Sequence, residues 1–335
     1  MIFFLKKKYI ALITVLLILL FSCNKYTKES NFAHTDIAVA SASEVESKID
    51  YKYYDVLDIA PAKIIVPKNQ TVAQGLSVLV NDGNGNLIVI DGGRVEDADY
   101  LCDIIKDNGG VVKTWFITHI HDDHIGALLK ILNDKRTDIE IKELYYDFAS
   151  FDWYYNKMGN DAGIYYLFEN AIKEYNDYLK FKNNNVVNIT KQKINQYSDM
   201  LSSIALNDVY TFDQDPINNT SIVYLVSILN GKHNMVVFGD LGYEGGKRLF
   251  TNIDKTWSED FFKSDIIVLA HHGQNGIDPE LYKKFSPKVV VWPTSKDIYE
   301  NTHGTYYTDD TKKVLSEINS IEYQIKSYEE TAVIR

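Results

Sequence analysis

The sequence predicts a mixed α/β domain in which β-strands and α-helices alternate. Between residues 64 and 146, short apolar and β-branched runs alternate with stretches of helical spacing. Along the whole chain, three apolar runs end within two residues of a histidine or aspartate, which puts metal-ligand residue types at strand ends. About 285 residues remain after an N-terminal leader and tether, enough for one large domain of this class.

The first 22 residues have the composition of an export signal. Residues 6–8 are three lysines, residues 9–21 form an apolar run, and Ser22 precedes Cys23. The small residue before Cys23 resembles the lipobox of bacterial lipoproteins, which implies cleavage at that point and lipid on the Cys23 thiol. The alternative is an uncleaved anchor, although the run is shorter than the roughly 20 residues of a spanning helix. In both cases we expect an exported chain held at a membrane, facing the periplasm or the cell exterior.

Residues 23–50 are rich in Ser, Lys, Glu, Asn and Ala and predict a flexible tether. Loss of the three lysines of the leader, which contains no acidic residue, moves the formal net charge from −11 to −14. No Lys/Arg cluster occurs outside the leader, so the charge argues against duplex nucleic acid as a partner. A small or cell-surface phosphoester remains compatible with it.

The domain, residues 51–335, is expected to open with a strand and a hairpin. Two apolar strands flank an Asn/Asp/Gly-rich turn, which favours antiparallel pairing. The predicted elements are a strand at 64–66, hairpin strands at 76–80 and 87–90, a helix at 96–108, a strand at 111–117, a helix at 124–133 and a strand at 141–146.

The main motif follows the strand at 111–117 and has the pattern H-x-H-x-D-H, formed by His119, His121, Asp123 and His124. Residues two apart in an extended backbone point the same way, so the first two histidines converge beyond the strand. Asp123 and His124 fall on the opening turn of the next helix, and Asp122 is left without a role.

Imidazole and carboxylate are ligands for Zn²⁺, with Mn²⁺ and Fe²⁺ as competitors. We expect one or two ions. Histidines satisfied by hydrogen bonds, or a closed structural zinc site, are the alternatives to an open catalytic site.

The motif resembles the signature of the metallo-β-lactamase fold superfamily. That resemblance implies an αββα sandwich, further ligands from later strand ends, and an aspartate beside the site, here Asp91, that orients the histidine loop.

Residues 147–206 depart from the resemblance and are rich in aromatic residues, with helical spacing from 162 to 181. In this superfamily such insertions often form the substrate wall, and aromatic rings could hold a quaternary ammonium or a sugar. Ordinary helix-to-sheet packing is the plainer interpretation.

Two later strands end in metal-ligand residue types. Asp240 follows the apolar run 235–238 and a glycine, and it matches the family's bridging carboxylate between two metals. The run 265–270 leads into His271-His272-Gly273, which matches the family's last histidine motif. Either histidine could be the ligand; we favour His272, with His271 as its neighbour or as a proton donor.

Two positions depart from the family pattern. The third ligand of the first ion, usually histidine, falls at Asn219 or Asn218, and an amide oxygen binds zinc more weakly than imidazole. His303 lies in an Asn-Thr-His-Gly element that resembles an Asn…Gly-His-Pro element of competence DNA-uptake proteins, with His and Gly exchanged. In that element His303 could contact substrate, act as a general acid or be an exposed loop histidine.

Within the superfamily, the motifs resemble the β-lactamase-like domain of competence DNA-uptake (ComEC-type) proteins and surface phosphorylcholine esterases. The resemblance implies a metallo-hydrolase, a phosphodiesterase that uses metal-bound hydroxide, with Asp123 as ligand or base. A catalytically silent metal-binding surface lipoprotein and an extracellular nuclease are the alternatives.

Overall fold

A computed structural model describes residues 49–206, 214–253 and 255–335. The predicted leader, the predicted lipidation site Cys23 and the predicted tether lie outside the described residues, apart from the last two tether positions. The helices are η1 Val95–Asp97, α2 Ala98–Asp107, α3 Asp122–Asn133, α4 Phe151–Met158, η2 Gly159–Ala162, α5 Gly163–Phe181, η3 Asn218–Thr220, α6 Tyr243–Asn252, α7 Lys255–Phe262, η4 Ala270–Gly273, η5 Pro279–Lys284, α8 Lys296–Glu300 and α9 Thr308–Ser316. None of the described helices is long and apolar enough to cross a membrane.

The described strands form two sheets. The first has the order β1-β16-β2-β3-β4-β5-β7-β8 with β6 beside β5, and the second has the order β15-β14-β13-β12-β11-β10-β9. The strands are β1 Tyr51–Tyr54, β2 Lys63–Val66, β3 Val78–Asn81, β4 Leu87–Ile90, β5 Val111–Phe116, β6 Glu140–Ile141, β7 Glu143–Tyr145, β8 Asn188–Thr190, β9 Ile194–Ser198, β10 Leu201–Ala205, β11 Tyr224–Ile228, β12 His233–Val237, β13 Ile266–Val268, β14 Val289–Trp292, β15 Tyr323–Lys326 and β16 Thr331–Ile334.

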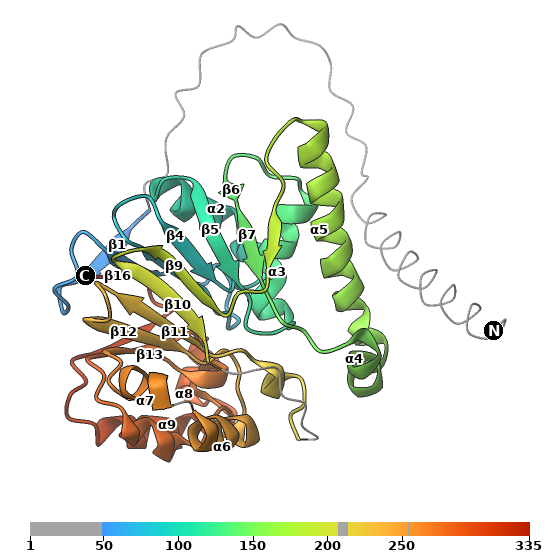
Figure 1. Cartoon of the computed structure of the whole chain (residues 1–335). Helices are drawn as coiled ribbons and strands as arrows, with labels where there is room; N and C mark the ends of the chain where they lie inside the picture. Colours follow the sequence, from blue (N-terminus) through green and yellow to red (C-terminus); the bar gives the residue numbers. More distant parts are fainter. Residues whose placement is uncertain (1–48, 207–213, 254) are drawn as a thin grey trace, which may run out of the picture. The chain divides into compact units, whose positions relative to one another are not determined.

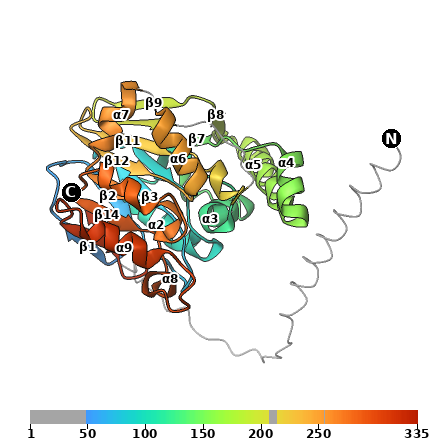
Figure 2. The same cartoon turned by 90° about the horizontal axis from the view of Figure 1, so that it is seen from below.

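The two sheets pack face to face, with helices on both outer faces (Figure 1). Helices α2, α3 and α5 cover the first sheet, and α6, α7 and α9 cover the second, as the view from below also shows (Figure 2). Three clusters of buried side chains fill the spaces between the four layers. The predicted αββα sandwich is therefore confirmed.

Most predicted elements lie within a few residues of their expected bounds. The hairpin β3–β4 is antiparallel, and β4 pairs with β5 in parallel. Asn218–Thr220 form a short 3-10 helix, and β11 begins only at Tyr224.

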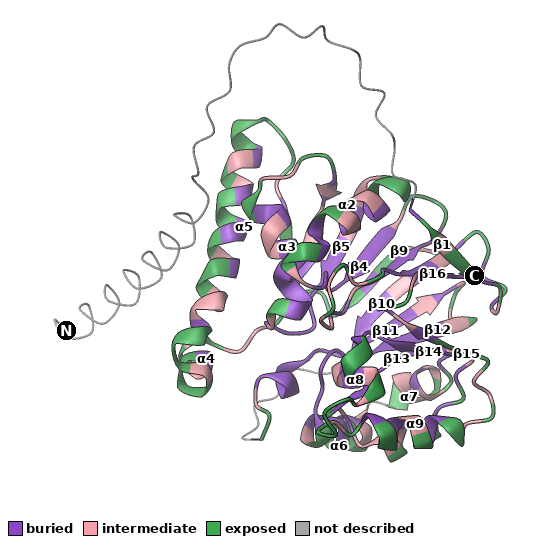
Figure 3. Ribbon diagram, turned by 180° about the vertical axis from the view of Figure 1, so that it is seen from behind, coloured by how far each residue is buried: buried purple, intermediate pink, exposed green. Residues whose placement is uncertain are grey.

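The aromatic insertion contains α4 and α5, and α5 packs on α3 (Figure 1). Phe168 and Tyr175 of α5 are buried, whereas Tyr166 is 43% exposed. Figure 3 shows the same alternation of buried and exposed positions along α5. Packing on α3 therefore accounts for the buried aromatic residues of α5, and the exposed rings remain free to meet a ligand.

Loops from the two sheets meet in close contact at one edge. Ile222 N–H donates to Thr118 O at 2.9 Å, which joins the chain before β11 to the chain after β5. A Cβ at Gly239 would lie 2.7 Å from Thr118 Cβ, so only glycine fits at that crossing, where φ is +58°. This contact brings the carboxyl ends of β5 and β12 together.

Candidate metal centre

The H-x-H-x-D-H loop joins β5 to α3 as predicted. His121 is the N-cap of α3, and Asp123 and His124 lie in its first turn. His119 and His124 are completely buried. The Nε2 atom of His119 lies 3.0 Å from Nδ1 of His121, so the two rings converge beyond the end of the strand.

Asp91, which directly follows β4, fixes this loop through hydrogen bonds. Its Oδ1 accepts the N–H of Thr118 at 2.8 Å, and its Oδ2 accepts the Thr118 hydroxyl at 2.7 Å. Nδ1 of His124 lies 2.7 Å from the same Oδ2. When that Nδ1 carries the proton, Nε2 keeps its lone pair for a cation, which is the usual arrangement of a metal-ligating histidine.

Asp240 lies between ligands of both parts of the loop. Its Oδ1 is 3.1 Å from His124 Nε2, and its Oδ2 is 3.8 Å from His119 Nε2. The side chain is 2% exposed, and its backbone N–H donates to Ser221 Oγ at 3.0 Å. The position fits the bridging role implied by the resemblance.

The His271-His272-Gly273 turn has an unusual backbone. His271 and His272 both adopt left-handed conformations, with φ of +47° and +58°. Such values are strained for residues other than glycine and often occur at functional sites. The turn sends the two imidazoles in different directions, with ring centroids 6.0 Å apart.

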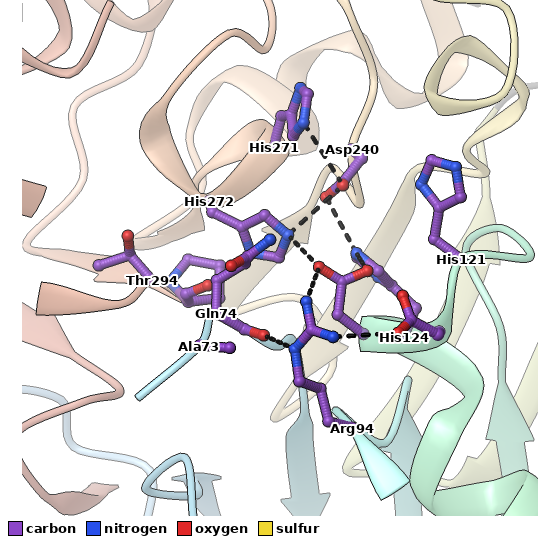
Figure 4. Close-up of polar contacts among 12 residues, drawn as sticks. Ala73, Gln74, Arg94, His121, His124, Asp240, His271, His272 and Thr294 are labelled. Atoms are coloured by element: carbon purple, nitrogen blue, oxygen red, sulfur yellow. Dashed lines mark hydrogen bonds and ion pairs between the residues drawn. The ribbon is translucent and has the colours of Figure 1, made fainter. Parts of the chain in front are cut away.

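His272 is fixed by Nδ1, which donates to Pro293 O at 2.5 Å. Its Nε2 lies 3.2 Å from Asp123 Oδ2 and 3.4 Å from Asp240 Oδ2. His271 lies on the other side of Asp240 from His272, with its Nε2 3.9 Å from Asp240 Oδ2. Figure 4 shows His271 and His121 on the side of Asp240 that faces away from Arg94.

The predicted ligands thus form two adjacent groups, and Asp240, a member of the first, also lies close to His124 and His272 of the second. Within each group the ligand atoms lie within 4.8 Å of one another. The groups are His119, His121 and Asp240, and Asp123, His124 and His272.

A cation fits the unsatisfied atoms of these groups. His124 Nε2, His272 Nε2 and Asp240 Oδ1 are buried without a hydrogen-bond partner. His124 Nε2 and Asp240 Oδ1 are close in distance, yet they are not aligned as donor and acceptor. Buried polar atoms of this kind are costly unless something satisfies them, and a divalent ion satisfies imidazole nitrogen and carboxylate oxygen together.

The charges of the site lead to the same conclusion. Burial, with the neighbouring His124 and His121, lowers the pKa of His119 well below its usual value, so this imidazole is neutral. Burial also acts against protonation of His272, but Asp240 and Asp123 outweigh it and raise the pKa of His272 to about 9. The buried carboxylates of Asp240 and Asp123 therefore favour a positive charge beside them, and a bound divalent ion would supply it in place of protons.

Asn219, expected as a ligand, is directed elsewhere. Its Oδ1 accepts the N–H groups of Gly242 and Gly245 at 3.1 and 2.9 Å, and its Nδ2 donates to Gln214 O. The amide therefore fixes the start of α6. Asn218 lies nearer the site: its Nδ2 is 3.3 Å from His271 Nε2, and its buried Oδ1 has no hydrogen-bond partner.

His303 lies in an exposed turn after α8. Among the described residues, no hydrogen bond or ion pair joins it to either ligand group. Arg94, which sequence reasoning missed, contacts Asp122 and Asp123. Its only sequence signal is its place three residues after Asp91.

The side chains of the two ligand groups, together with Asp91 and His271, come from the carboxyl ends of strands. Asp91 follows β4, the histidine loop follows β5, Asp240 follows β12, and His271 and His272 follow β13. Parallel pairing of β4 with β5 and of β12 with β13 places each pair of ends at one edge of its sheet.

Residues 71–184 match the family model of the metallo-beta-lactamase superfamily. The matched stretch runs from before β3 to just after α5, and it contains the whole H-x-H-x-D-H motif. The four-layered fold agrees with the metallo-β-lactamase sandwich. The narrower resemblance to competence proteins and phosphorylcholine esterases rests on the motif residues alone and stays a prediction.

No curated protein matches the chain in sequence. Similar solved structures include the metallo-beta-lactamase fold protein YhfI from Bacillus subtilis, at 11% identity and TM-score 0.43 over 79% of this chain and 95% of that one. Yeast PDE1 is 12% identical, with TM-score 0.44 over 82% and 97%. Tm1679, a metal-dependent hydrolase of the beta-lactamase superfamily, is 15% identical, with TM-score 0.43 over 79% and 96%. Similarity at this level does not transfer an activity.

Proposed function

We propose that this chain is a metal-dependent phosphodiesterase with two zinc ions, or manganese or iron in their place. The observation that carries the proposal is the buried Asp240 between two ligand groups. Divalent ions held by these residues would supply polarisation of a scissile phosphoester bond and would lower the pKa of a bound water to about 7.

The charge of the loaded site supports an anionic substrate. Two divalent ions would bring four positive charges against the carboxylates of Asp123 and Asp240, with Asp91 behind His124. The centre would remain positive inside a chain of net charge −11. A small diester with one negative charge suits that combination, whereas a long polyanion meets repulsion from the surrounding surface.

Each residue of the site has a separate role in this proposal, which follows from its position. Asp91 and Pro293 O hold the outer nitrogens of His124 and His272, so both Nε2 atoms face the centre. His271 has the reach to supply the imidazole that the first group lacks at the Asn219 position. Asp123, buried among the ligands, serves as a ligand in this proposal and not as a free base.

The substrate wall is proposed to be the insertion. Tyr154 of α4 is buried, with its hydroxyl 3.4 Å from Thr220 Oγ1, so α4 lies beside the 3-10 helix that carries Asn218 and Asn219. Exposed rings on α4, such as that of Tyr155, could hold a choline or sugar group of the substrate.

The leader adds a proposal about location. Residues 6–23 support export and lipidation at Cys23, which would place the enzyme at a membrane facing the periplasm or cell exterior. Cys23→Ser should release the chain from the membrane fraction; retention there would contradict the lipid anchor.

Hydrolysis of bis(p-nitrophenyl) phosphate and p-nitrophenylphosphorylcholine by the zinc- or manganese-loaded chain tests the proposal. Turnover that disappears in His121→Ala and Asp240→Asn is the expected result. Turnover of a carboxylic ester but of neither phosphodiester would overturn the substrate class. A loaded chain that is silent on all these esters would favour a metal-binding surface lipoprotein, and cleavage of single-stranded DNA that falls steeply with salt would favour a nuclease.

A further inference from the structure

Arg94 connects the end of β4 to the first turn of α3. Its Nη1 donates to Asp122 Oδ2 at 3.0 Å, and its Nη2 lies 3.5 Å from Asp123 Oδ2. Its Nε donates to Gln74 O at 2.8 Å. Figure 4 shows the Arg94 side chain with its contact to Gln74, on the side of the centre away from His121.

The backbone of Arg94 is also fixed in place. A Cβ at Gly126 would lie 2.6 Å from Val95 N and 3.0 Å from Arg94 Cα, so glycine lets α3 approach this segment closely. The N–H of Arg94 donates to Asp97 Oδ2 at 2.7 Å. Because both ends of the side chain are held, little conformational freedom remains to be lost when it binds a carboxylate.

Arg94 contacts two consecutive carboxylates that have different surroundings. The side chain of Asp123 is 8% exposed and faces His272, whereas that of Asp122 is 71% exposed. A planar guanidinium has several donors in fixed directions and can hold both carboxylates together, which the single ammonium of lysine cannot do equally well.

We propose that Arg94 is a positioning residue for the ion held by Asp123, His124 and His272. It orients the Asp123 carboxylate toward that ion and keeps Asp122 out of the ligand group. The inference rests on the metal centre of the proposed function, though not on its substrate. Removal of an outer partner of a ligand typically costs about 10–100-fold in metal affinity.

Zinc affinity of the full chain in detergent, measured by competition with a chelating dye, tests this in two backgrounds. His121→Ala disables the first group, so the remaining ion is the one next to Arg94. His272→Ala disables the second group and leaves the other ion. We expect Arg94→Ala to weaken zinc binding about 10–100-fold in the first background and to leave it unchanged in the second.

Lys130→Ala is the matched control. Lys130 lines the same surface groove of about 550 Å³ as Arg94, but it pairs with Asp134 at 2.6 Å and touches no ligand. Its loss removes the same charge from the same face. Arg94→Lys keeps the charge and should restore affinity only in part.

The absorption spectrum of the cobalt-loaded chain gives a readout that a merely structural role would not move. Arg94→Ala should change the bands of the ion beside Asp123 while the thermal unfolding of the metal-free chain stays within a few degrees of the parent. Equal weakening in both backgrounds, an equal effect of Lys130→Ala, or unchanged affinity would each overturn the inference. If Arg94→Ala does not fold, Arg94→Lys carries the same comparison. These measurements use no substrate, so failure of the phosphodiesterase proposal leaves their outcome readable.

Discussion

Nδ1 of His124 lies 2.7 Å from Oδ2 of Asp91, and both side chains are completely buried. The same carboxylate also accepts both donors of Thr118. One side chain therefore sets the ring orientation of His124 and the backbone of the loop that also carries His119, His121 and Asp123.

Asp91→Asn should weaken zinc binding about 10–100-fold, because an amide holds the imidazole less firmly than a carboxylate does. Chelator competition measures the change. Asp99→Asn, at an exposed position of α2 that pairs with Arg136, is the control and should leave zinc affinity unaltered. Equal affinities in Asp91→Asn and the parent would show that the histidine loop keeps its orientation without this carboxylate.

The turn at Gly273 should tolerate no side chain. Its φ is +79°, and a Cβ there would lie 2.3 Å from the ring of Trp292. Gly273→Ala should therefore lower the free energy of unfolding by about 2–4 kcal/mol, from overpacking and backbone strain together.

Urea unfolding of the metal-free chain measures this loss. Gly163→Ala is the control: nothing lies within 4 Å of a Cβ at that position, which begins α5, so its effect should be near zero. Similar losses in the two variants would contradict the packing argument.

Among the sequence predictions, the position of the candidate ligands at strand ends could be read from the sequence because it depends on local structure. A residue just after a buried parallel strand must emerge at the sheet edge, and this holds for Asp240 and for His272. Neither position required knowledge of a distant segment.

Asn219 and Arg94 show where such reasoning ends. The direction of the Asn219 amide depends on Gly242 and Gly245, and the role of Arg94 depends on the approach of α3 at Gly126. Those contacts arise only when separate elements pack. No local pattern in the sequence reports them.

Cys102 should be inert in the folded chain. It is completely buried, and burial raises the pKa of its thiol to about 12. Because the thiolate is the reactive species, a Cys23→Ser chain, which keeps Cys102 as its single cysteine, should not react with a disulfide reagent at pH 8 until it is unfolded. Rapid labelling of the native chain would mean that α2 opens readily.

The ion pair of Asp138 with Arg136 should produce a small acid-dependent loss of stability. A side-chain hydrogen bond from Arg136 lowers the pKa of Asp138 from 3.8 to about 2. The folded state therefore gains stability from this carboxylate above pH 4, and the gain disappears as the pH falls toward 2.

More than a third of the Asp138 side chain is exposed, so solvent screening keeps the gain near 0.5–1 kcal/mol, about the value of good surface pairs. Asp138→Asn should be less stable than the parent by that amount at pH 6 and equally stable near pH 2, as judged by urea unfolding at each pH. A difference that persists at pH 2 would assign the effect to packing.

Each ligand group draws on both halves of the sandwich. His119 and His121 follow a strand of the first sheet and meet Asp240 from the second, while Asp123 and His124 meet His272 in the same way. Each ion would thus cross-link the two halves reversibly. The described residues contain one free cysteine and no disulfide. The availability of metal would then set the stability of the contact between the two sheets as well as the activity.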